Sequence, residues 1–347
     1  MGNSICAALL GGMLALSLFG TTVAGSLEDA KAAIKRGDFP TALRLFTPLA
    51  TGGDAAAEYE LYNLYSIGVA GVPKNKAQAT YWLRKAADAG EADAQTELGL
   101  DYSSGIGVAK DDVEAVRWFR RSAEQGDFFG QWMLGQSYRD GTGVRRDHAE
   151  AAKWYRLSAA QGNKYAAAEV GNMYFSGDGI PRDYSLAAYW YKVAAYKGDM
   201  GGQQGLGELY RKGLGVNQSY MEAYNLFKLA ADQGDTQAET AIGKMFYEGQ
   251  GRPQDYNEAV KWFTEAALRG DPGGQGMLGM MYSRGRGVSQ DYVQAYKWLN
   301  ISASEYVDAA ASPRDATIRA RNMVAALMTA AQIAEANALA RDWKPIQ

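Results

Sequence analysis

The residue best suited to acid–base chemistry is His148, the single histidine among 347 residues. An imidazole titrates near neutral pH and is the commonest general base. However, His148 occupies one position of a 36-residue internal repeat, whose other copies carry Asp112, Tyr184, Tyr220, Tyr256 and Tyr292. A histidine in place of tyrosine at the expected start of a helix indicates a structural variant. We therefore predict no catalytic residue.

The sequence also lacks the side chains needed for a metal site, for thiol chemistry or for a phosphate-binding loop. Cys6 is the only cysteine, and with one histidine a zinc site has too few ligands. The pair Gly105-x-Gly107 precedes an expected helix, as a phosphate-binding loop does, but no Lys-Ser/Thr follows and no strand is expected before it. Acidic pairs such as Asp111-Asp112 recur where helices should begin, which helix capping explains. We predict no metal and no cofactor.

The first 27 residues carry no charged side chain and include an apolar run over residues 5–19. Small residues follow, so we predict a secretory signal over residues 1–24 with cleavage after Ala24. Residues 1–4 lack the usual Lys or Arg, and an uncleaved anchor is an alternative, although the run is short for a span of about 20 residues. N-myristoylation fails because Cys6 stands where Ser or Thr is required. With Cys6 removed, the mature chain would hold no disulfide.

One internal period of 36 residues organises most of the chain. Its most regular position is a glycine, found at Gly99, Gly135, Gly171, Gly207, Gly243 and Gly279. In each copy an apolar residue directly precedes this glycine, and an aromatic residue stands three positions after it. Two more glycines come next, as in Leu98, Tyr102, Gly105 and Gly107. Leu98 and Tyr102 are four residues apart and share one helix face, and Gly99 lets a second helix approach closely. Gly105 and Gly107 permit a tight reversal with positive φ.

The second half of each repeat predicts another helix. It begins at a residue that can cap free amides, namely Asp111, Asp147, Asp183, Ser219, Asp255 and Asp291. Residues such as Ala115 and Trp118 should line its buried face, and a glycine such as Gly126 should end it. Neither helix can bury its apolar face alone, so stacked neighbours must share one core.

The ends of the chain predict atypical helices. Residues 25–54 read as a divergent helix pair with its turn at 37–40. Residues 307–347 predict two closing helices, one from Ser312 to about Met328 and one that begins with a capping box at 329–332 and runs to about Trp343.

The pattern Leu-Gly-x-x-Tyr-x-x-Gly-x-Gly-Val, followed by Asp, Ala, Trp and Ala-Ala-x-x-Gly, resembles the Sel-1-like repeat family, a branch of the tetratricopeptide superfamily. The resemblance covers residues 55–306 and implies an all-α fold, a right-handed α-solenoid of seven antiparallel helix pairs with a C-terminal helical cap. The departures are Leu226 for Trp, Ser219 for Asp and Arg252 for Val, and they make the fifth repeat the weakest copy.

In this superfamily the first helix of each pair lines the concave face, where positions that vary between repeats contact partners. Those positions predict a partner-binding surface with an aromatic cluster of Phe129, Trp132, Tyr165 and Phe175, a basic stripe of Arg139, Arg211, Lys212, Lys244 and Arg284, and two further residues, Asn172 and Tyr247. Aromatic and arginine side chains often carry binding energy at interfaces. The alternatives are that Trp132 is an ordinary core residue and that the basic residues are merely solvated.

The resemblance implies a non-catalytic adaptor, scaffold or regulator, either periplasmic or secreted. Its partner would be an envelope, membrane-sensor or host protein. A formal net charge of −3 disfavours nucleic acid, and no membrane insertion is expected after signal removal. A scaffold that binds glycan, either peptidoglycan or exopolysaccharide, is the alternative, because aromatic rings stack on sugars. A cell-wall-related hydrolase is the weakest alternative, because the mature sequence lacks any Ser-x-x-Lys.

Overall fold

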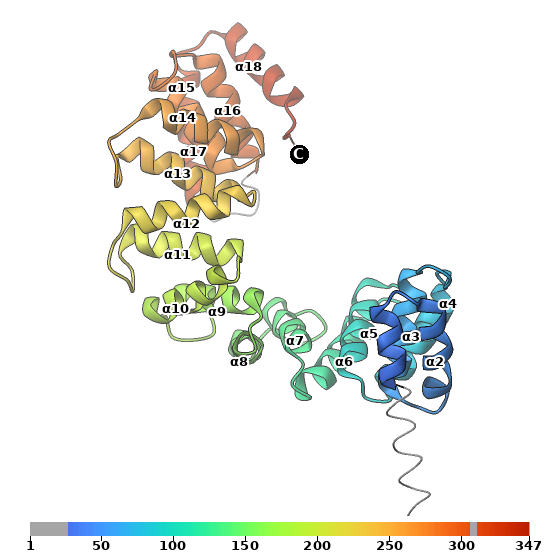
Figure 1. Ribbon diagram of the computed structural model, residues 1–347. Coiled ribbons are helices and arrows are strands. Elements are labelled where there is room, and N and C mark those ends of the chain that lie inside the picture. Colours follow the sequence, from blue (N-terminus) through green and yellow to red (C-terminus); the bar gives the residue numbers. More distant parts are fainter. Residues whose placement is uncertain (1–26, 306–310, 347) are drawn as a thin grey trace, which may run out of the picture. The chain divides into compact units, whose positions relative to one another are not determined.

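The computed structural model describes residues 27–305 and 311–346, which form helices joined by short turns (Figure 1). The described residues divide into two compact units, an N-terminal unit up to Ala166 and a C-terminal unit from Ala167 onward. Within these ranges the only β-type pairing is an isolated bridge between Val69 and Val72. The predicted all-α class is confirmed.

Each repeat contributes a first and a second helix, and nearly all of them are 13 residues long. The first helices are α3 (Ala55–Ile67), α5 (Ala92–Ser104), α7 (Phe128–Asp140), α9 (Lys164–Ser176), α11 (Met200–Lys212), α13 (Thr236–Glu248) and α15 (Pro272–Arg284). The second helices are α4 (Lys76–Asp88), α6 (Asp112–Glu124), α8 (His148–Ala160), α10 (Tyr184–Tyr196), α12 (Tyr220–Asp232), α14 (Tyr256–Leu268) and α16 (Tyr292–Glu305).

The helices pack in chain order within each unit. A first helix lies along its own second helix, as α5 does along α6 and α11 along α12. Each second helix then packs against the first helix of the next pair, as α6 does against α7 and α12 against α13. First helices also touch one another, since α5 contacts α7 and α13 contacts α15. The apolar faces thereby form a shared core, as the repeat pattern predicts.

Additional helices cover both ends of the repeat array. A helix over residues 27–35 and α2 (Phe39–Thr51) bury Phe46 against the first repeat. At the other end α17 (Ala311–Ala325) and α18 (Ala330–Asp342) both contact α16. The predicted capping box is present, because Thr329 and Gln332 exchange side-chain and backbone hydrogen bonds. Helix α17 ends earlier than the predicted Met328, because the backbone tightens into a turn there.

The capping residues act as predicted. Asp111 accepts hydrogen bonds from the amides of Val113 and Glu114, both at 3.0 Å, and Ser219 does the same for the amide of Glu222 at 3.3 Å. Gly105 and Gly107 have φ values of 71° and 75°, which residues with a β-carbon rarely adopt.

The first repeat differs from the others in the turn between α3 and α4. Its two positive-φ glycines, Gly68 and Gly71, are three residues apart, whereas the later copies have a spacing of two. The additional residue is absorbed by the bridge, in which Val69 and Val72 exchange backbone hydrogen bonds of 2.9 and 2.8 Å. This local change keeps the following helix in register.

The departure at Arg252 also has a packing explanation. Its guanidinium lies 3.7 Å from the ring centroid of Tyr224 and 4.6 Å from that of Phe246. Stacking on two rings replaces the apolar contact that valine would make in this turn.

A close helix contact is made by the repeated glycine of the first helix. A β-carbon placed on Gly135 would lie 2.7 Å from the ring of Tyr155 on the second helix. The other copies are equally close, with rings of Phe119 at Gly99, Tyr191 at Gly171, Phe227 at Gly207 and Phe263 at Gly243, and with Leu299 at Gly279. The predicted close approach is confirmed.

The division of the chain into a signal segment, a divergent pair, seven repeats and a cap remains a prediction. The proposed signal over residues 1–24 lies outside the described residues.

We expect Gly135→Ala to lower the free energy of unfolding by about 1–2 kcal/mol. Overpacking a core costs about 1–3 kcal/mol, and the better helix propensity of alanine returns only about 1 kcal/mol. Urea denaturation followed by circular dichroism measures the difference. The matched control is Gly201→Ala on α11, where the nearest atom to the new β-carbon is 3.4 Å away, and that variant should gain stability. Equal stability of the two variants would contradict the packing argument.

Candidate partner-binding site

We call the surface formed by the outward side chains of the first helices the inner face of each unit. In the N-terminal unit it is built by α3, α5, α7 and the start of α9. In the C-terminal unit it is built by α11, α13 and α15. Since the second helices fill the space behind them, only one side of each first helix is free to meet another molecule.

Three of the four predicted aromatic residues come together on the N-terminal inner face. Phe129 and Trp132 stack with ring centroids 5.4 Å apart, and Trp132 lies 5.7 Å from Tyr165. We call these residues the aromatic trio. Trp132 is partly buried between the other two rings, and Tyr165 is 53% exposed. Trp132 is therefore neither an enclosed core residue nor a fully solvated one.

The fourth aromatic residue, Phe175, lies in the C-terminal unit and is not part of this stack. Its ring meets Tyr184 at a centroid distance of 5.6 Å and an angle of 62°. Phe175 packs against the core cluster around Ala187 and Tyr191 of α10, so its side chain serves local packing. The four-residue cluster expected from the sequence is thus a trio.

A second feature of the N-terminal inner face is a row of carboxylates along α5. Asp93, Glu97 and Asp101 are spaced by four residues and share one side of the helix. No ion pair within the described ranges involves any of the three. We call these residues the acidic row. Like charges at this spacing cost a helix about 0.2–0.5 kcal/mol per pair, so the row reduces the stability of the isolated chain.

The carboxyl groups of the acidic row have raised pKa values. Burial and the nearby Glu97 carboxylate raise the pKa of Asp101 to about 6, against a partial offset from Lys76. Burial also raises the pKa of Glu97 and of Asp93. The row faces two stacked tyrosines on α3, Tyr59 and Tyr62, whose centroids are 5.6 Å apart. Burial and the charge of Glu97 raise the pKa of Tyr62 to about 12.

The acidic row does not stand out when each residue is compared with the equivalent residue 36 positions away. That comparison singles out Phe129 or Trp132, which differ from their copies. The row runs along a single helix instead, and its signal is the spacing Asp93, Glu97, Asp101. A search for like charges four residues apart would have found it.

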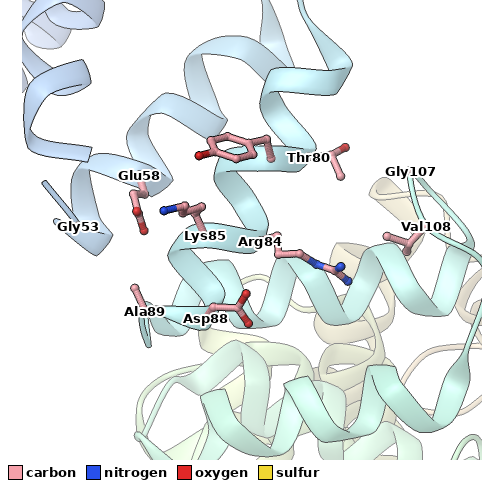
Figure 2. A pocket seen from close by; sticks show the side chains of 10 residues that line it. Gly53, Glu58, Thr80, Arg84, Lys85, Asp88, Ala89, Gly107 and Val108 are labelled. Carbon is pink, nitrogen blue, oxygen red and sulfur yellow. The ribbon is translucent and has the colours of Figure 1, made fainter. Parts of the chain in front are cut away.

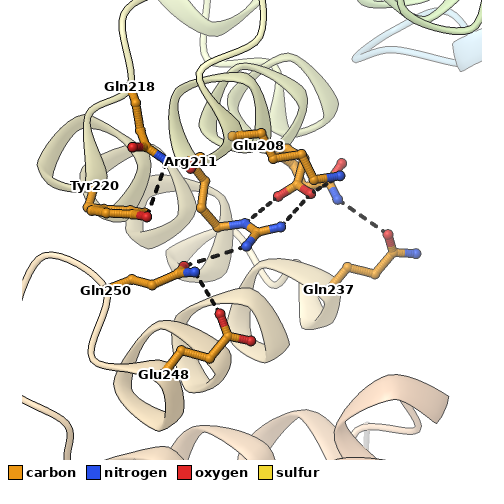
Figure 3. Close-up of polar contacts among 9 residues, drawn as sticks. Glu208, Arg211, Gln218, Tyr220, Gln237, Glu248 and Gln250 are labelled. Atoms are coloured by element: carbon orange, nitrogen blue, oxygen red, sulfur yellow. Dashed lines mark hydrogen bonds and ion pairs between the residues drawn. The ribbon is translucent and has the colours of Figure 1, made fainter.

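On the C-terminal inner face the predicted basic stripe is partly neutralised. Arg211 and Lys212 both pair with Glu208, at 2.8 and 2.7 Å, and Figure 3 shows the Arg211 guanidinium between Glu208 and Gln250. Two hydrogen bonds from Arg211 lower the pKa of Glu208 despite its burial, which alone would raise it. A pocket of about 360 Å³ adjoins this network and is also lined by Lys244.

The other predicted residues have individual surroundings. Lys244 is exposed, whereas Arg284 donates a 3.2 Å hydrogen bond to the Tyr247 hydroxyl. Arg139 pairs with its neighbour Asp140 at 2.8 Å. Asn172 accepts a 2.8 Å hydrogen bond from the Tyr191 hydroxyl. Whether any of these residues binds a partner remains a prediction.

The described residues add two observations about chemistry. Across residues 27–305 and 311–346, no group of three or more His, Cys, Asp or Glu side chains is arranged to hold a metal ion. No helix in the same ranges is long and apolar enough to cross a membrane. His148 is the first residue of α8 and directly follows the cap Asp147, as expected for a structural position.

Antiparallel pairs of 13-residue helices with a shared core define an α-solenoid repeat protein. The family model of the Sel1 repeat matches seven segments, which are residues 55–91, 92–127, 129–163, 164–199, 202–235, 236–271 and 272–306. The chain therefore belongs to the Sel1 repeat family, as its motifs predict. Sel1 repeat proteins are generally protein–protein interaction scaffolds and typically lack catalytic activity, which indicates protein partners in general.

Two solved structures are similar over most of the chain. A Sel1 repeat protein from Oxalobacter formigenes is 28% identical with a TM-score of 0.61, and the match covers 89% of this chain and 90% of that one. A protective antigen present in uropathogenic Escherichia coli strains, which displays an SLR fold, is 26% identical with a TM-score of 0.57 over 95% and 93% of the two chains. None of the curated proteins compared with the chain matches it.

The raised pKa of Asp101 gives the acidic row a measurable pH dependence. Its folded-state value of about 6 lies above the ordinary 3.8, so the folded chain binds this proton more tightly. The contribution of Asp101 to stability therefore improves as pH falls from 7 towards 5. We expect Asp101→Asn to raise the melting temperature at pH 7.5 and to have a smaller effect at pH 5.

Differential scanning fluorimetry across this pH range measures the effect. Glu124→Gln is the control, because it removes one negative charge from an exposed position on the adjacent α6. A pH-independent gain for Asp101→Asn, or the same profile for both variants, would show that the carboxylate of Asp101 titrates normally.

Proposed function

We propose that this protein is a non-catalytic scaffold of the bacterial cell envelope, periplasmic or secreted, that binds a segment of a partner protein on the N-terminal inner face. The observation that carries this proposal is the aromatic trio. The three rings lie in contact on adjacent first helices, and Tyr165 is 53% exposed. Rigid aromatic side chains bury large areas at interfaces with little loss of conformational freedom.

The acidic row indicates the charge of the partner segment. Three carboxylates without ion pairs repel one another on the isolated chain, and Lys or Arg side chains of a partner would relieve that repulsion. The tyrosines beside the row add ring faces that attract cations. A basic segment with one or more apolar anchors therefore suits this face better than an acidic one.

The C-terminal inner face supports this assignment by contrast. Two of its cations, Arg211 and Lys212, already pair with Glu208, which reduces the charge available there to a ligand. Its pocket of about 360 Å³ is small beside a peptide-length groove. We place the main contact on the N-terminal unit for this reason.

The partner class proposed from the family is an envelope protein, a membrane sensor or a host protein. One relative is described as a protective antigen of uropathogenic Escherichia coli strains, and an antigen recognised in this way is consistent with exposure of such a protein to the host. Signal-directed export of the present chain would place its inner face in the same kind of surroundings.

Crosslinking in intact cells of the native bacterium, followed by mass spectrometry, tests the proposed interaction. We expect a protein to crosslink to the wild-type chain and the yield to fall about 10-fold or more for Trp132→Ala and for Tyr165→Ala, as for hot-spot residues. Tyr196→Ala is the matched control, because Tyr196 is 93% exposed on the second helix α10. Its crosslinking yield should equal that of the wild type.

Other outcomes of this experiment would count against a protein partner. If the chain is retained by insoluble cell wall, and if digestion of the wall releases it while Trp132→Ala abolishes retention, the ligand is glycan. If all three variants crosslink equally, the aromatic trio does not form the binding surface.

Export has its own test. Expressed with its own N-terminus in Escherichia coli, the chain should be recovered from the periplasm with a mature N-terminus at Gly25. Intact-mass measurement of the fractionated protein identifies the first residue. Recovery of a full-length chain from the cytoplasm would refute the predicted signal, and a full-length membrane-bound chain would indicate an uncleaved anchor.

A further inference from the structure

In four of the repeats a side-chain bridge joins the end of the second helix to the first helix of the same repeat. The residue directly after a second helix reaches back 30 positions, to the fourth residue of the preceding first helix. These bridges join Gln125 to Gln95 at 2.8 Å, Gln161 to Gln131 at 2.9 Å and Gln233 to Gln203 at 2.7 Å. In each of them an amide N–H donates to the buried side-chain oxygen.

One copy of this bridge uses an arginine and a glutamate. Arg269, directly after α14, donates from Nη1 to the Glu239 carboxylate at 2.6 Å and from Nη2 to the backbone oxygen of Gly234 at 2.9 Å. Gln161 makes the equivalent second bond, to the backbone oxygen of Gly126 at 2.8 Å. The position therefore presents two acceptors, a side-chain oxygen and a glycine carbonyl, to one planar donor group.

In the first repeat both acceptors are present but the donor is missing. Glu58 is the fourth residue of α3, as Glu239 is of α13, and Gly53 precedes the cap of α3 as Gly234 precedes that of α13. The residue directly after α4 is Ala89, which has no hydrogen-bond donor in its side chain. Glu58 is 2% exposed, and its Oε2 has no hydrogen-bond partner among the described residues.

An open pocket of about 720 Å³ lies where the donor would be. Gly53, Glu58 and Ala89 all line it (Figure 2). Gly53 and Glu58 supply the two acceptors, and the small side chain of Ala89 leaves the space that a donor would fill. Burial raises the pKa of Glu58, as expected for a carboxylate whose compensating donor is absent.

Nearby cations do not replace the missing donor. Figure 2 shows the Lys85 amine directed toward Glu58, but the two form no ion pair in the described part of the chain. Arg84 also lines the pocket, and its guanidinium donates a hydrogen bond to the Tyr102 hydroxyl. Asp88 adds a second carboxylate, which raises the pKa of Glu58 further. The charge of Lys85 lowers the pKa of Glu58 in part, but the Oε2 atom still has no hydrogen-bond donor among the described residues.

The opposite end of the array closes the same gap with its own chain. Gln275 is the fourth residue of α15, and its Oε1 also lacks a partner among the described residues. There, however, Pro345 covers Gly270, the counterpart of Gly53, and the amide of Ile346 donates to the Leu268 carbonyl. The pocket at the first repeat has no such cover among the residues that line it.

We propose that the pocket at Glu58 binds the guanidinium group of an arginine side chain from a partner protein. The guanidinium would donate to Glu58 Oε2 and to the Gly53 carbonyl, as Arg269 does in its own repeat. Lysine is a point donor and cannot bridge both acceptors in a fixed geometry. The segments outside the described residues contain no Lys or Arg, so they cannot supply the cation. The pocket is lined mainly by α4, a second helix, and is separate from the inner face.

The test uses the full-length protein and three peptides, acetyl-Gly-X-Gly-amide with X as arginine, lysine or citrulline. Citrulline keeps the shape of arginine without its charge. In NMR titrations we expect the arginine peptide to shift the amide signals of Gly53 and Ala89, with an affinity about 10-fold or more above that of citrulline, the value of one charge-assisted hydrogen bond. The lysine peptide should fall between them.

Two variants separate binding from folding. Ala89→Arg should fill the pocket from within, raise the melting temperature and abolish peptide binding. Ala160→Arg places the same side chain beside the satisfied Gln161 and should leave both properties unchanged. Glu58→Gln should weaken arginine binding about 10-fold, provided that its circular dichroism matches the wild type.

Three results would overturn the proposal, namely equal affinity for arginine and citrulline, arginine binding retained by Ala89→Arg, or a lower melting temperature for Ala89→Arg than for Ala160→Arg. Loss of binding at the aromatic trio would leave this test unaffected, since the two surfaces share no residue.

Discussion

The contact between a ring of the second helix and a glycine of the first sets the geometry of the whole repeat array. At Gly135 the ring of Tyr155 occupies the space that a β-carbon would need. Four further copies place a ring there, and in a fifth Leu299 takes that place. Because one side of the first helix is held this tightly, its position relative to the second helix hardly varies between repeats. The rest of the first helix is then free to vary without loss of the fold.

The variable positions of the first helices carry different kinds of side chain in the two units. The N-terminal inner face carries stacked rings and unpaired carboxylates, which cost stability and gain nothing within the chain itself. The C-terminal inner face pairs Arg211 and Lys212 with Glu208, so part of its charge is compensated internally. A surface whose charges remain uncompensated is the better candidate for a ligand, since binding and not folding supplies the missing partners.

The fold was predictable from the sequence because each structural requirement recurs at a fixed spacing. Glycine at close contacts, aspartate at caps and alanine at buried positions each appear in successive copies, so chance coincidence is excluded. The site was only partly predictable. Trp132 stands out against its copies, but the acidic row and the pairing of Arg211 with Glu208 depend on neighbours within one helix. Comparison between repeats cannot reveal such contacts, and only the three-dimensional arrangement separated Phe175 from the trio.

The bridges within the repeats distinguish the first repeat from those in which the bridge is complete. In the second and third repeats the donor comes from the end of the repeat's own second helix, so the acceptors of Gln95 and Gln131 are satisfied. A bridge with one half missing leaves a buried acceptor, which costs about 1–3 kcal/mol unless another group satisfies it. At the last repeat the C-terminal residues cover the gap, whereas at Glu58 alanine leaves it open. An unsatisfied buried carboxylate beside an open pocket is costly for stability alone, and a ligand that restores the bridge would remove that cost.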